Sequence, residues 1–473
     1  MTPEEFRTAG HALVDWIADY RSSLPERPVR AQVEPGAVRR ALPSDPPEGG
    51  DSVESLLRDL SEIIAPGLTQ VQHPMHFGWF PSNATLSSVL GDLASGGLGS
   101  LGISWESAPA LTEVEQVVCD WMRQLLGLSE GWHGTIIDTA SSATLVALIA
   151  ARERASGFSK DRDGLQGHAQ PLTVYTTAQA HSSVLKAALL AGFGADNVRM
   201  VGTDSLSHAM RPDLLRKALQ QDLDAGSKPA AIIATVGSTG VTALDPVSGI
   251  AHIAREFDCW VHVDAAMAGS AMLLRECRWM WTGVENTDSV SLNPHKWMGT
   301  ILDCSLLYVR DPRALTEVFA TSPAYLRAAE DDQVVQYRDW GIPLGRRFRA
   351  LKLWFHLRID GPGAIRERLR ADLEDTQWLA EEIGRTPDWQ VVAPVPLQTV
   401  CLRHEPASLH GDDDAIDRHN LDWVDRLNRS GQAFLSTAEL DERVIVRVSV
   451  GVESADRSHL EALWALMQSY AQP

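Results

Sequence analysis

The chain has 473 residues, enough for about three compact units at roughly 150 residues each. It carries 62 acidic and 42 basic residues, and the formal net charge of −20 argues against a nucleic-acid or anionic-membrane partner, because binding either needs concentrated positive charge. With 44% hydrophobic and 22% charged residues, the composition is that of a globular protein with a sizeable core and excludes a largely disordered chain.

The apolar runs and the cysteines favour a cytoplasmic protein. No apolar run reaches the roughly 18–20 residues that span a membrane, and the first residues, MTPEEF, lack the basic and apolar regions of a signal peptide. The five cysteines are scattered and form no C-x-x-C pair, so we expect neither a disulfide framework nor a metal site.

The N-terminal residues predict a helix. Thr2 can cap it, Glu5 completes a capping box, and an apolar stripe follows at helical spacing: Phe6, Ala9, Leu13, Ile17 and Tyr20. The residues of Leu24–Gly50 are rich in Pro, Gly and Arg and predict an extended connector, and Ser52–Ile64 predicts a short helix. A helical layer tied on in this way covers either a neighbouring domain or subunit, or the edge of the main domain.

The middle of the chain alternates between apolar, β-rich runs and helical stretches. Strands are expected at Leu172–Thr176, Val198–Val201, Ala230–Val236, Trp260–Val263, Ser289–Leu292 and Ser305–Val309. Helices are expected at Ser183–Ala191, Asp213–Leu223 and Val247–Phe257. This rhythm predicts an α/β fold with a largely parallel sheet, which binds ligands at the carboxyl ends of its strands. The last strand is expected to run antiparallel, because its connection from Lys296 is short.

The last part of the chain predicts a smaller α+β unit. Helices are expected over Phe348–Arg358 and Gly363–Ile383, and a closing helix begins near Ser458. Short strands are expected at Trp389–Val392, Thr399–Leu402 and Val444–Val450. The polar stretch 405–414 is predicted to be a solvated loop.

Lys296 is the most informative single residue. It is one of only six lysines, and it directly follows an apolar strand, in the turn of SLNPHKWMG at residues 291–299. A lysine at the mouth of an apolar sheet is expected to have a depressed pKa and to act as a nucleophile or form a Schiff base. Taken alone, the same lysine could simply extend from a strand end into solvent.

Further polar groups are predicted at the same edge of the sheet. Asp264 ends the strand of CWVHVDAAMAG, and the small residues after it leave room for a flat ring whose protonated nitrogen pairs with the carboxylate. Thr139 and Ser141 precede an apolar helix whose first N–H groups can bind a phosphate. His181 lies between a strand and a helix. Each has an ordinary structural explanation, as a helix cap, an ion pair or a core residue, but with Lys296 they describe a pyridoxal phosphate site.

These motifs resemble the aromatic-L-amino-acid decarboxylases, which are group II pyridoxal phosphate-dependent decarboxylases of fold-type I. The resemblance rests on NPHKW, HVDAA-x-AG, AHSSV and IPLGRRFR-x-LK-x-WF, and it extends from Phe6 through VEPGAVR and HPMHFGWFPS to Trp464. It implies a mostly parallel seven-stranded sheet flanked by helices, pyridoxal 5′-phosphate as the cofactor, an amino-acid substrate, and a homodimer with shared active sites.

The resemblance also implies three segments along the chain. Residues 1–85 form an N-terminal helical segment that packs on the dimer partner, residues 86–350 form the large cofactor-binding α/β domain, and residues 351–473 form the small C-terminal α+β domain.

Each matching residue receives an implied role. Lys296 holds the cofactor as a Schiff base, Asp264 keeps its ring nitrogen protonated, and His181 stacks on the ring near the substrate carboxylate. Tyr325, in TSPAYLRAAE, matches the tyrosine of a mobile loop that helps protonate Cα after CO2 leaves. The other implied cofactor contacts are Ala140, Ser141, Thr239, Asn293 and His295. The implied substrate pocket consists of Trp79, Phe80, Pro81, Ser82, Leu101, Ile103, Gly345 and again His181, with Leu101 and Ile103 contributed by the partner subunit.

Some positions depart from the family pattern. Asp138 stands where a glycine is usual, beside the expected phosphate, and Ser142 replaces an acidic residue. Ile103 replaces a common aromatic residue and Ser82 a threonine, so the preferred substrate stays open among tryptophan, DOPA, tyrosine and phenylalanine. Gly345 matches a glycine that accompanies indole substrates in plant members, which favours tryptophan.

Three other functions were weighed against decarboxylation to an arylalkylamine. The presence of both Tyr325 and His181 disfavours an aromatic aldehyde synthase, in which one of these residues is replaced. The apolar pocket residues disfavour a non-aromatic substrate such as glutamate or histidine. A catalytically inactive pyridoxal-binding protein is disfavoured because every residue with an implied role is present.

Overall fold

The computed structural model describes residues 1–321 and 333–472, and its contacts group them into two compact units. The terminal unit combines Met1–Pro81 with Glu374–Val392 and Val400–Pro473, and the central unit combines Ser82–Leu373 with Ala393–Thr399. Both ends of the chain thus contribute to one unit. The division into three segments, with boundaries after residues 85 and 350, stays a prediction.

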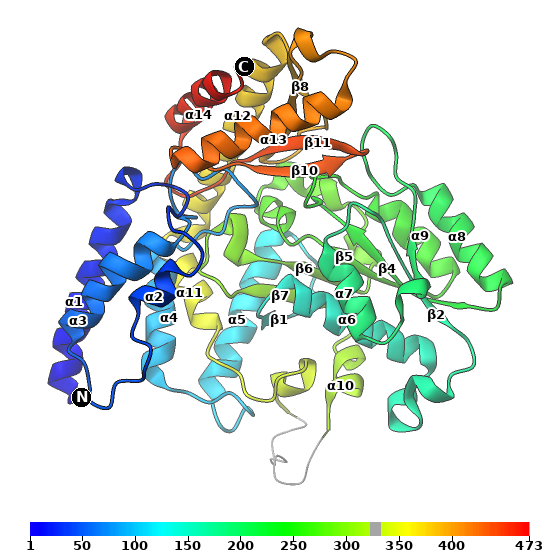
Figure 1. Ribbon diagram of the computed structural model, residues 1–473. Helices are drawn as coiled ribbons and strands as arrows, with labels where there is room; N and C mark the ends of the chain where they lie inside the picture. The colour runs from blue at the N-terminus through cyan, green and yellow to red at the C-terminus, as the bar shows by residue number, and fades with distance from the viewer. Residues whose placement is uncertain (322–332, 473) are drawn as a thin grey trace. The chain divides into compact units, whose positions relative to one another are not determined.

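The central unit is built on the seven-stranded sheet that the resemblance implied (Figure 1). Its strands are β1 (His133–Ile137), β2 (Leu172–Thr176), β3 (Val198–Met200), β4 (Lys228–Thr235), β5 (Trp260–Asp264), β6 (Ser289–Leu292) and β7 (Ser305–Val309). Their order across the sheet is β1-β7-β6-β5-β4-β2-β3. Neighbours among β2 to β6 pair in parallel, whereas β7 is antiparallel to both β6 and β1, which confirms the orientation expected for this strand.

Helices pack along this sheet and explain its apolar strands. The helices of the unit are α4 (Leu86–Leu98), α5 (Pro109–Leu126), α6 (Ala140–Ser156), α7 (Ser182–Leu190), α8 (Pro212–Asp224), α9 (Val247–Glu256), α10 (Arg313–Phe319) and α11 (Ala350–Ile359). Figure 1 shows α7 beside α6 and α8 beside α9, and α6 runs across β1, β2 and β4 to β7. Every residue of β4 after Lys228 is buried, as expected for a strand in a covered parallel sheet.

The terminal unit contains the second, four-stranded sheet, in the order β10-β11-β9-β8. Its strands are β8 (Trp389–Val391), β9 (Thr399–His404), β10 (Ser436–Leu440) and β11 (Arg443–Ser449). Its helices are α1 (Pro3–Ser22), α2 (Ala37–Ala41), α3 (Val53–Asp59), α13 (Asp413–Ser430) and α14 (Arg457–Tyr470). Helix α12 (Gly361–Arg385) crosses the boundary between the two units.

Short 3₁₀ and π turns complete the list of elements. They are η1 (Leu24–Glu26), η2 (Leu60–Ile64), η3 (Ala65–Gly67), η4 (Ser159–Asp161), η5 (Gly164–Gly167), η6 (Ala195–Asn197), η7 (Ala268–Leu273), η8 (Arg275–Trp281), η9 (Val284–Asn286), η10 (Pro294–Met298), η12 (Tyr337–Trp340) and η13 (Ala407–Leu409). No helix of the described part of the chain is long and apolar enough to cross a membrane.

The strands and helices expected from the sequence occur, with ends that agree to within two residues in all but one of them. The exception is the helix expected over Ser52–Ile64, which is divided into α3, ending at Asp59, and the π turn η2. Two expectations need correction. The connector is not extended throughout, because it contains α2, and the loop expected at 405–414 contains η13 and the start of α13. The aspartates of that stretch begin the helix: the Asp412 side chain accepts a hydrogen bond from the Ala415 N–H at 2.9 Å, and acidic residues are favourable in a first helical turn.

Helix α1 has the predicted start, but its apolar face is only partly covered. The Thr2 hydroxyl accepts from the Glu5 N–H, and the Glu5 carboxylate accepts from the Thr2 N–H, which confirms the capping box. No residue of α1 is buried, and Phe6 is 60% exposed. Ala9, Ile17 and Tyr20 are half-buried, and the Tyr20 hydroxyl is hydrogen-bonded to Gln70, so the described residues cover the apolar stripe only in part.

Candidate functional site

The lysine turn follows β6 directly. Asn293 follows the last strand residue, Leu292, and precedes the π turn η10. This turn carries Lys296, whose backbone departs from helical geometry at φ −99° and ψ −119°. The turn closes on itself, because the Lys296 N–H donates to the Asn293 carbonyl at 3.0 Å and the Gly299 N–H donates to the Pro294 carbonyl at 3.0 Å. The kink presents the lysine at the carboxyl end of β6 rather than along a helix.

Helix α12 fixes this turn from outside. The indole of Trp297 is fully buried and donates to the Asp372 carboxylate at 2.7 Å. The Arg368 guanidinium donates to the carbonyls of Trp297 and Met298 at 2.8 and 2.7 Å. Because these partners hold the residues after Lys296, the position of the amine is determined by the packed interior.

The electrostatic surroundings of Lys296 favour a neutral amine. Burial lowers its pKa below the ordinary lysine value, and the negative charge of Asp264 partly opposes that shift. A neutral amine is the nucleophilic form, so the expected activation of Lys296 has its physical cause in desolvation.

Asp264 is the last residue of β5 and lies between β4 and β6. Its register partners are Thr235 on β4 and Ser291 on β6, and its side chain is 5% exposed. One carboxylate oxygen accepts from the Ala266 N–H at 3.0 Å. The second oxygen of this buried carboxylate is suited to a charge-assisted bond from a cationic ring nitrogen.

His181 begins α7, and its hydrogen bonds define its tautomer. The Nδ1 atom accepts from the Ser183 N–H at 3.1 Å and lies 2.8 Å from the Ser183 hydroxyl. In the neutral ring the proton is therefore on Nε2. Partial burial lowers the pKa of His181, the positive charge of Lys296 lowers it further, and Asp264 raises it, so the histidine lies within electrostatic reach of both residues.

Helix α6 begins at the same edge without a side-chain cap. Thr139 is its N-cap residue but makes no side-chain capping bond, so Ala140 and Ser141 open a helix whose first N–H groups face outward. Nearby, the side-chain Oδ1 atom of Asn293 accepts from the Ser305 hydroxyl at 2.7 Å, so the side-chain NH2 group is the part of this amide that could donate to a ligand.

The two remaining implied cofactor residues differ in their surroundings. Thr239 lies, half-buried, in the turn closed by the bridge between Val236 and Leu244. His295 is buried, and its Nδ1 accepts from the Cys304 N–H at 3.0 Å. The structure thus gives His295 a bond that holds the lysine turn, and its contact with a cofactor stays a prediction.

This donor set fits pyridoxal phosphate. An uncapped helix N-terminus suits the phosphate, a buried carboxylate suits the protonated ring nitrogen, and a lysine of lowered pKa suits the aldehyde carbon. The hydroxyl of Thr235, at the carboxyl end of β4, is buried and has no hydrogen-bond partner among the described residues, which is consistent with a polar ligand at this edge.

The implied substrate residues fall into separate groups. In the central unit, Gly102 and Arg346 form a two-way backbone bridge, and a Cβ on Gly345 would lie 4.0 Å from the Leu101 Cδ1 atom. The structure therefore brings Leu101, Ile103 and Gly345 into one neighbourhood. Ser82 stands at the start of this unit, before α4.

Trp79, Phe80 and Pro81 belong to the terminal unit. Trp79 adopts a left-handed φ of 53°, which is rare for a bulky residue, and its ring lies 4.9 Å from that of Phe434. The Arg447 guanidinium lies 5.1 Å over the Phe80 ring. Tyr325 lies outside the described residues, so its role stays a prediction.

Sequence reasoning missed two buried groups of the central unit. His262 is fully buried two residues before Asp264, and the two-residue period of a strand could have placed it on the same face. Arg346 is also buried and donates to the Glu115 carboxylate at 2.7 Å. The arginines of IPLGRRFR pointed to this segment, but only the fold shows which one is buried.

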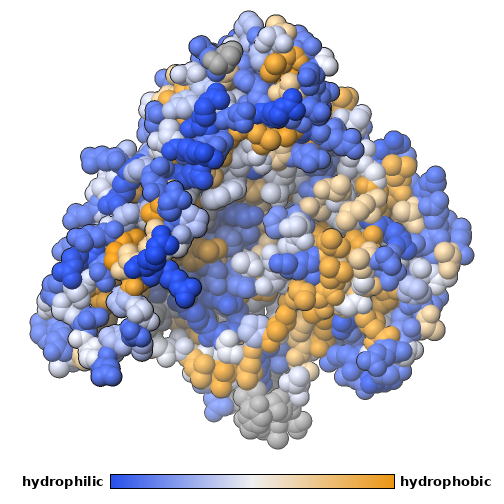
Figure 2. Space-filling view, in the orientation of Figure 1, coloured by the Kyte–Doolittle hydropathy of each residue, from blue (hydrophilic) through white to orange (hydrophobic). Residues whose placement is uncertain are grey.

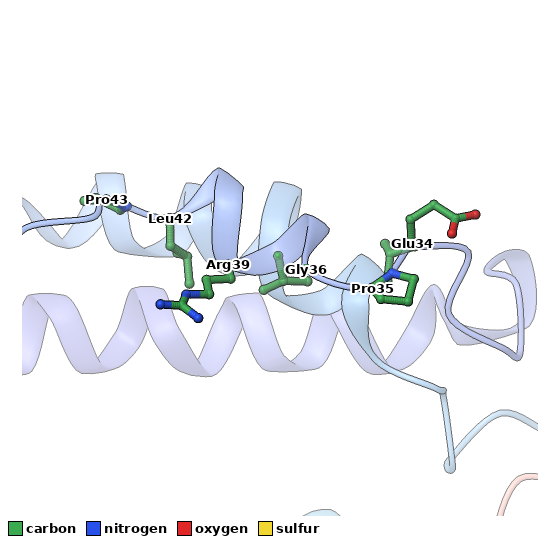
Figure 3. A pocket seen from close by; sticks show the side chains of 8 residues that line it. Glu34, Pro35, Gly36, Arg39, Leu42 and Pro43 are labelled. Atoms are coloured by element: carbon green, nitrogen blue, oxygen red, sulfur yellow. The ribbon is translucent and has the colours of Figure 1, made fainter.

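Two open hollows lie away from all of these residues. One, of about 680 Å³, lies along the connector, where Figure 3 shows the side chains of Arg39, in α2, and Leu42, just after it, pointing to the same side. The other, of about 720 Å³, is lined by α8 and α9 residues such as Arg216 and Glu256. Neither hollow is lined by a predicted site residue, so the candidate site remains at the carboxyl edge of the seven-stranded sheet.

Comparisons with known proteins agree with this arrangement. Residues 35–405 match the model of the pyridoxal-dependent decarboxylase conserved domain. The chain is 39% identical over 482 residues to tyrosine decarboxylase 4 of Petroselinum crispum, covering 100% of this chain and 94% of that protein. It is 37% identical over 480 residues to phenylacetaldehyde synthase of Arabidopsis thaliana, and this match covers 100% of this chain and 96% of that protein. The crystal structure of Oryza sativa TDC with PLP and tryptamine matches with a TM-score of 0.96 at 34% identity, covering 100% of this chain and 98% of that one.

Proposed function

The chain belongs to the pyridoxal-dependent decarboxylase family, and on that premise we propose that it removes the α-carboxylate of an aromatic L-amino acid as CO2 and releases the arylalkylamine. The observation that carries the proposal is the joint placement of Lys296 and Asp264 at one edge of the sheet, with His181 in electrostatic reach of both. These groups supply a nucleophilic amine, a buried negative charge and a hydrogen-bond donor.

The proposed roles of the residues follow from their chemistry. Lys296 would hold pyridoxal phosphate through Nζ, Asp264 would pair with the ring nitrogen, and the first turn of α6 with Asn293 would bind the phosphate. When bound, the cofactor supplies an electron sink for the pair released as the bond from Cα to the carboxylate breaks. Thr239 and His295 complete the proposed cofactor contacts.

His181 and Tyr325 would act on the substrate. The Nε2–H of His181 is free of the α7 cap and would donate to the substrate carboxylate, which orients the bond that breaks. Tyr325 would give a proton to Cα once CO2 has left, and a covered site would keep water away during that transfer.

We propose an aromatic substrate, because apolar and aromatic residues dominate the implied pocket. Trp79, Phe80, Leu101 and Ile103 offer apolar surface, and Gly345 leaves room for a large ring. One relative named above is a tyrosine decarboxylase, another is a phenylacetaldehyde synthase, and the matched crystal structure holds tryptamine. Tyrosine, phenylacetaldehyde and tryptamine all contain an aromatic ring. We favour tryptophan as the substrate, because Gly345 matches the glycine that accompanies indole substrates in plant members of the family.

A second candidate is the aromatic aldehyde synthase, since a phenylacetaldehyde synthase is among the similar proteins. We favour amine formation because His181 and Tyr325 are both retained. The variant Tyr325→Phe should shift the product from amine towards aldehyde, and unchanged amine output in that variant would contradict the proposed proton transfer.

We further propose that the working form is a homodimer, which helix α4 supports. Its buried residues are Ser87, Ser88, Gly91 and Ser95, whereas its large apolar side chains are exposed, with Leu90 at 47% and Leu98 at 64%. A soluble helix normally buries its apolar face. Figure 2 shows apolar residues gathered in a band across the face on which α7 lies, and α7 itself exposes Leu189 and Leu190. A second copy, contributing Leu101 and Ile103 to the site, would cover these surfaces.

We propose the cytoplasm as the location, because all five cysteines are free and buried, as a reducing compartment allows.

The test of the proposed function is a substrate panel. Purified protein is incubated with pyridoxal phosphate and with phenylalanine, tyrosine, DOPA, tryptophan, glutamate or histidine, and CO2, amine and aldehyde are measured. We expect CO2 and amine in equal amounts from at least one aromatic substrate. The proposal fails if no substrate yields CO2 although borohydride traps the cofactor on the chain.

A further inference from the structure

Four buried polar side chains form a chain of hydrogen bonds on the face of β5 and β6 that carries Asp264. Trp260 and His262 share this face because side chains on one strand alternate with a period of two. Ser289 and Ser291 are the register partners of His262 and Asp264 on β6. The indole is 2% exposed, and the imidazole and both hydroxyls are fully buried.

The direction of each bond follows from what each group can do. The Trp260 Nε1–H can only donate, and it donates to the Ser289 hydroxyl oxygen at 2.9 Å. The Ser289 O–H is then left to donate to Nδ1 of His262 at 2.9 Å. This arrangement favours the ring proton on Nε2, which faces the Ser291 hydroxyl at 3.3 Å.

This order of donors also keeps the imidazole uncharged. A proton on Nδ1 would require the Ser289 oxygen to accept from two N–H groups and to turn its own O–H away from His262. Full burial penalises the charged ring as well: it lowers the pKa of His262 to about 4, although the negative charge of Asp264 acts in the opposite direction.

We propose that His262 is a positioning residue for Asp264: the bonds from Trp260 through Ser289 keep an uncharged imidazole beside the carboxylate, so that no internal cation competes with the cofactor's ring nitrogen for its charge. The inference rests on the proposed function, because only a cofactor with a protonated ring nitrogen uses that charge.

The other basic groups near Asp264 follow the same pattern. Burial lowers the pKa of Lys296 and of His181, and the negative charge of Asp264 acts against both shifts. All three basic groups around the carboxylate are thus biased towards their neutral forms, which leaves its charge for a ligand.

The first test observes the imidazole in the cofactor-free protein. Histidines are labelled with ¹⁵N, and the His262 signals are assigned by their loss in His262→Gln. We expect a neutral ring with its proton on Nε2 that does not titrate between pH 8 and 6. Trp260→Phe changes no atom of the imidazole but frees the Ser289 oxygen. It should therefore populate the Nδ1–H form or raise the pKa of His262 by about one unit, which is measured by extending the titration to pH 4. A charged ring at pH 6 in the unchanged protein, or identical spectra in Trp260→Phe, would overturn the inference.

The second test measures the dissociation constant of pyridoxal phosphate from its absorbance between pH 8 and 4. Ser289→Ala removes the bond that favours the neutral ring, so the pKa of His262 should rise by about one unit from about 4, and cofactor affinity should fall about fivefold more between pH 8 and 4 than in the control. The control is Ser270→Ala, because the Ser270 hydroxyl is also fully buried but has no hydrogen-bond partner among the described residues.

Adding His262→Gln to Ser289→Ala should abolish that pH dependence, because the titrating ring is gone. If Ser289→Ala behaves like Ser270→Ala, or if the dependence survives in the double variant, the inference is wrong. Trp260→Phe serves in the same measurement should Ser289→Ala not fold. A protein that shows the predicted tautomer but binds no pyridoxal phosphate would refute the proposed function instead.

Discussion

The carboxyl edge of the central sheet and helix α4 belong to the same unit but bury opposite kinds of side chain. At the edge, Asp264 and Asn293 are at most 5% exposed, and each has a partner from the same chain. On α4 the serines and a glycine are buried while the leucines face outward. The polar groups of the edge thus find their partners within one chain, whereas the apolar face of α4 is left exposed by the described residues. A substitution at the edge therefore tests the chemistry directly, and a substitution on α4 tests it through the assembly.

The largest expected effect comes from removing the amine at the edge. Lys296→Ala should reduce turnover on the order of 10⁴-fold or more, as deletion of a single nucleophile does elsewhere, and should abolish borohydride trapping of the cofactor. Lys217→Ala, at an exposed position on α8, is the matched control and should leave turnover unchanged. Normal turnover in Lys296→Ala would refute its role.

Breaking the α4 face should separate the subunits without altering the edge. Leu90→Glu places a charge on the exposed apolar stripe, so the mass in solution should fall to that of one chain and activity should drop at least about tenfold, because like charges meet across the interface. Leu206→Glu, at a loop residue that is 79% exposed, is the control and should change neither. A monomeric unchanged protein with full activity would disprove the proposed assembly.

Acid should lower the stability of the folded chain through its buried histidines. Burial lowers the pKa of His262 and of His295 to about 4 and that of His356 to about 3, so the unfolded chain binds more protons than the folded one below pH 6.5. The free energy of unfolding should fall as pH decreases from about 6.5 to 4, by up to about 1.4 kcal/mol per pH unit for each histidine.

One buried carboxyl acts in the opposite sense. Burial raises the pKa of Asp245 to about 6, so this group gains a proton more readily in the folded state and adds stability as pH falls. The loss of stability from the three histidines is larger than the gain from Asp245, so the net free energy of unfolding should fall. Urea unfolding of the cofactor-free protein at pH 7, 6 and 5 measures the net slope, and His262→Gln should reduce it. Stability that is constant across this range would contradict the burial of these rings in the neutral form.

The smallest effect is expected from the buried side of α4. A Cβ on Gly91 would lie 2.6 Å from the Leu351 carbonyl oxygen of α11, so Gly91→Ala should destabilise the protein by about 1–3 kcal/mol. On the same helix, a Cβ on Gly96 meets no atom within 4 Å, and Gly96→Ala should stabilise the helix by up to about 1 kcal/mol. Equal effects in the two variants would show that α4 and α11 are not packed this closely.

Much of the site was predictable because its signals are local. The turn of NPHKW, the carboxylate of HVDAA and the histidine before α7 each follow an apolar run, and parallel strands place such ends at one edge. Strand β10 was not predicted, because its residues STAEL alternate between half-buried and exposed positions and carry little apolar signal. The expected loop at 405–414 failed because Asp412 and the residues after it cap a helix as readily as they solvate a turn.

The sequence by itself determined strands β2 to β7 of the central sheet and the identity of the lysine, because strand periodicity, helix caps and turn residues act over a few positions. Only the tertiary structure decided which groups surround Asp264, the carboxylate near Lys296. The bond between Trp260 and Ser289 joins residues 29 apart, and the packing of Gly91 against Leu351 joins helices far apart in the sequence. Such pairs arise from strand register and helix packing, which no local pattern encodes. The charge state of His262 and the outward face of α4 are both consequences of that register and packing.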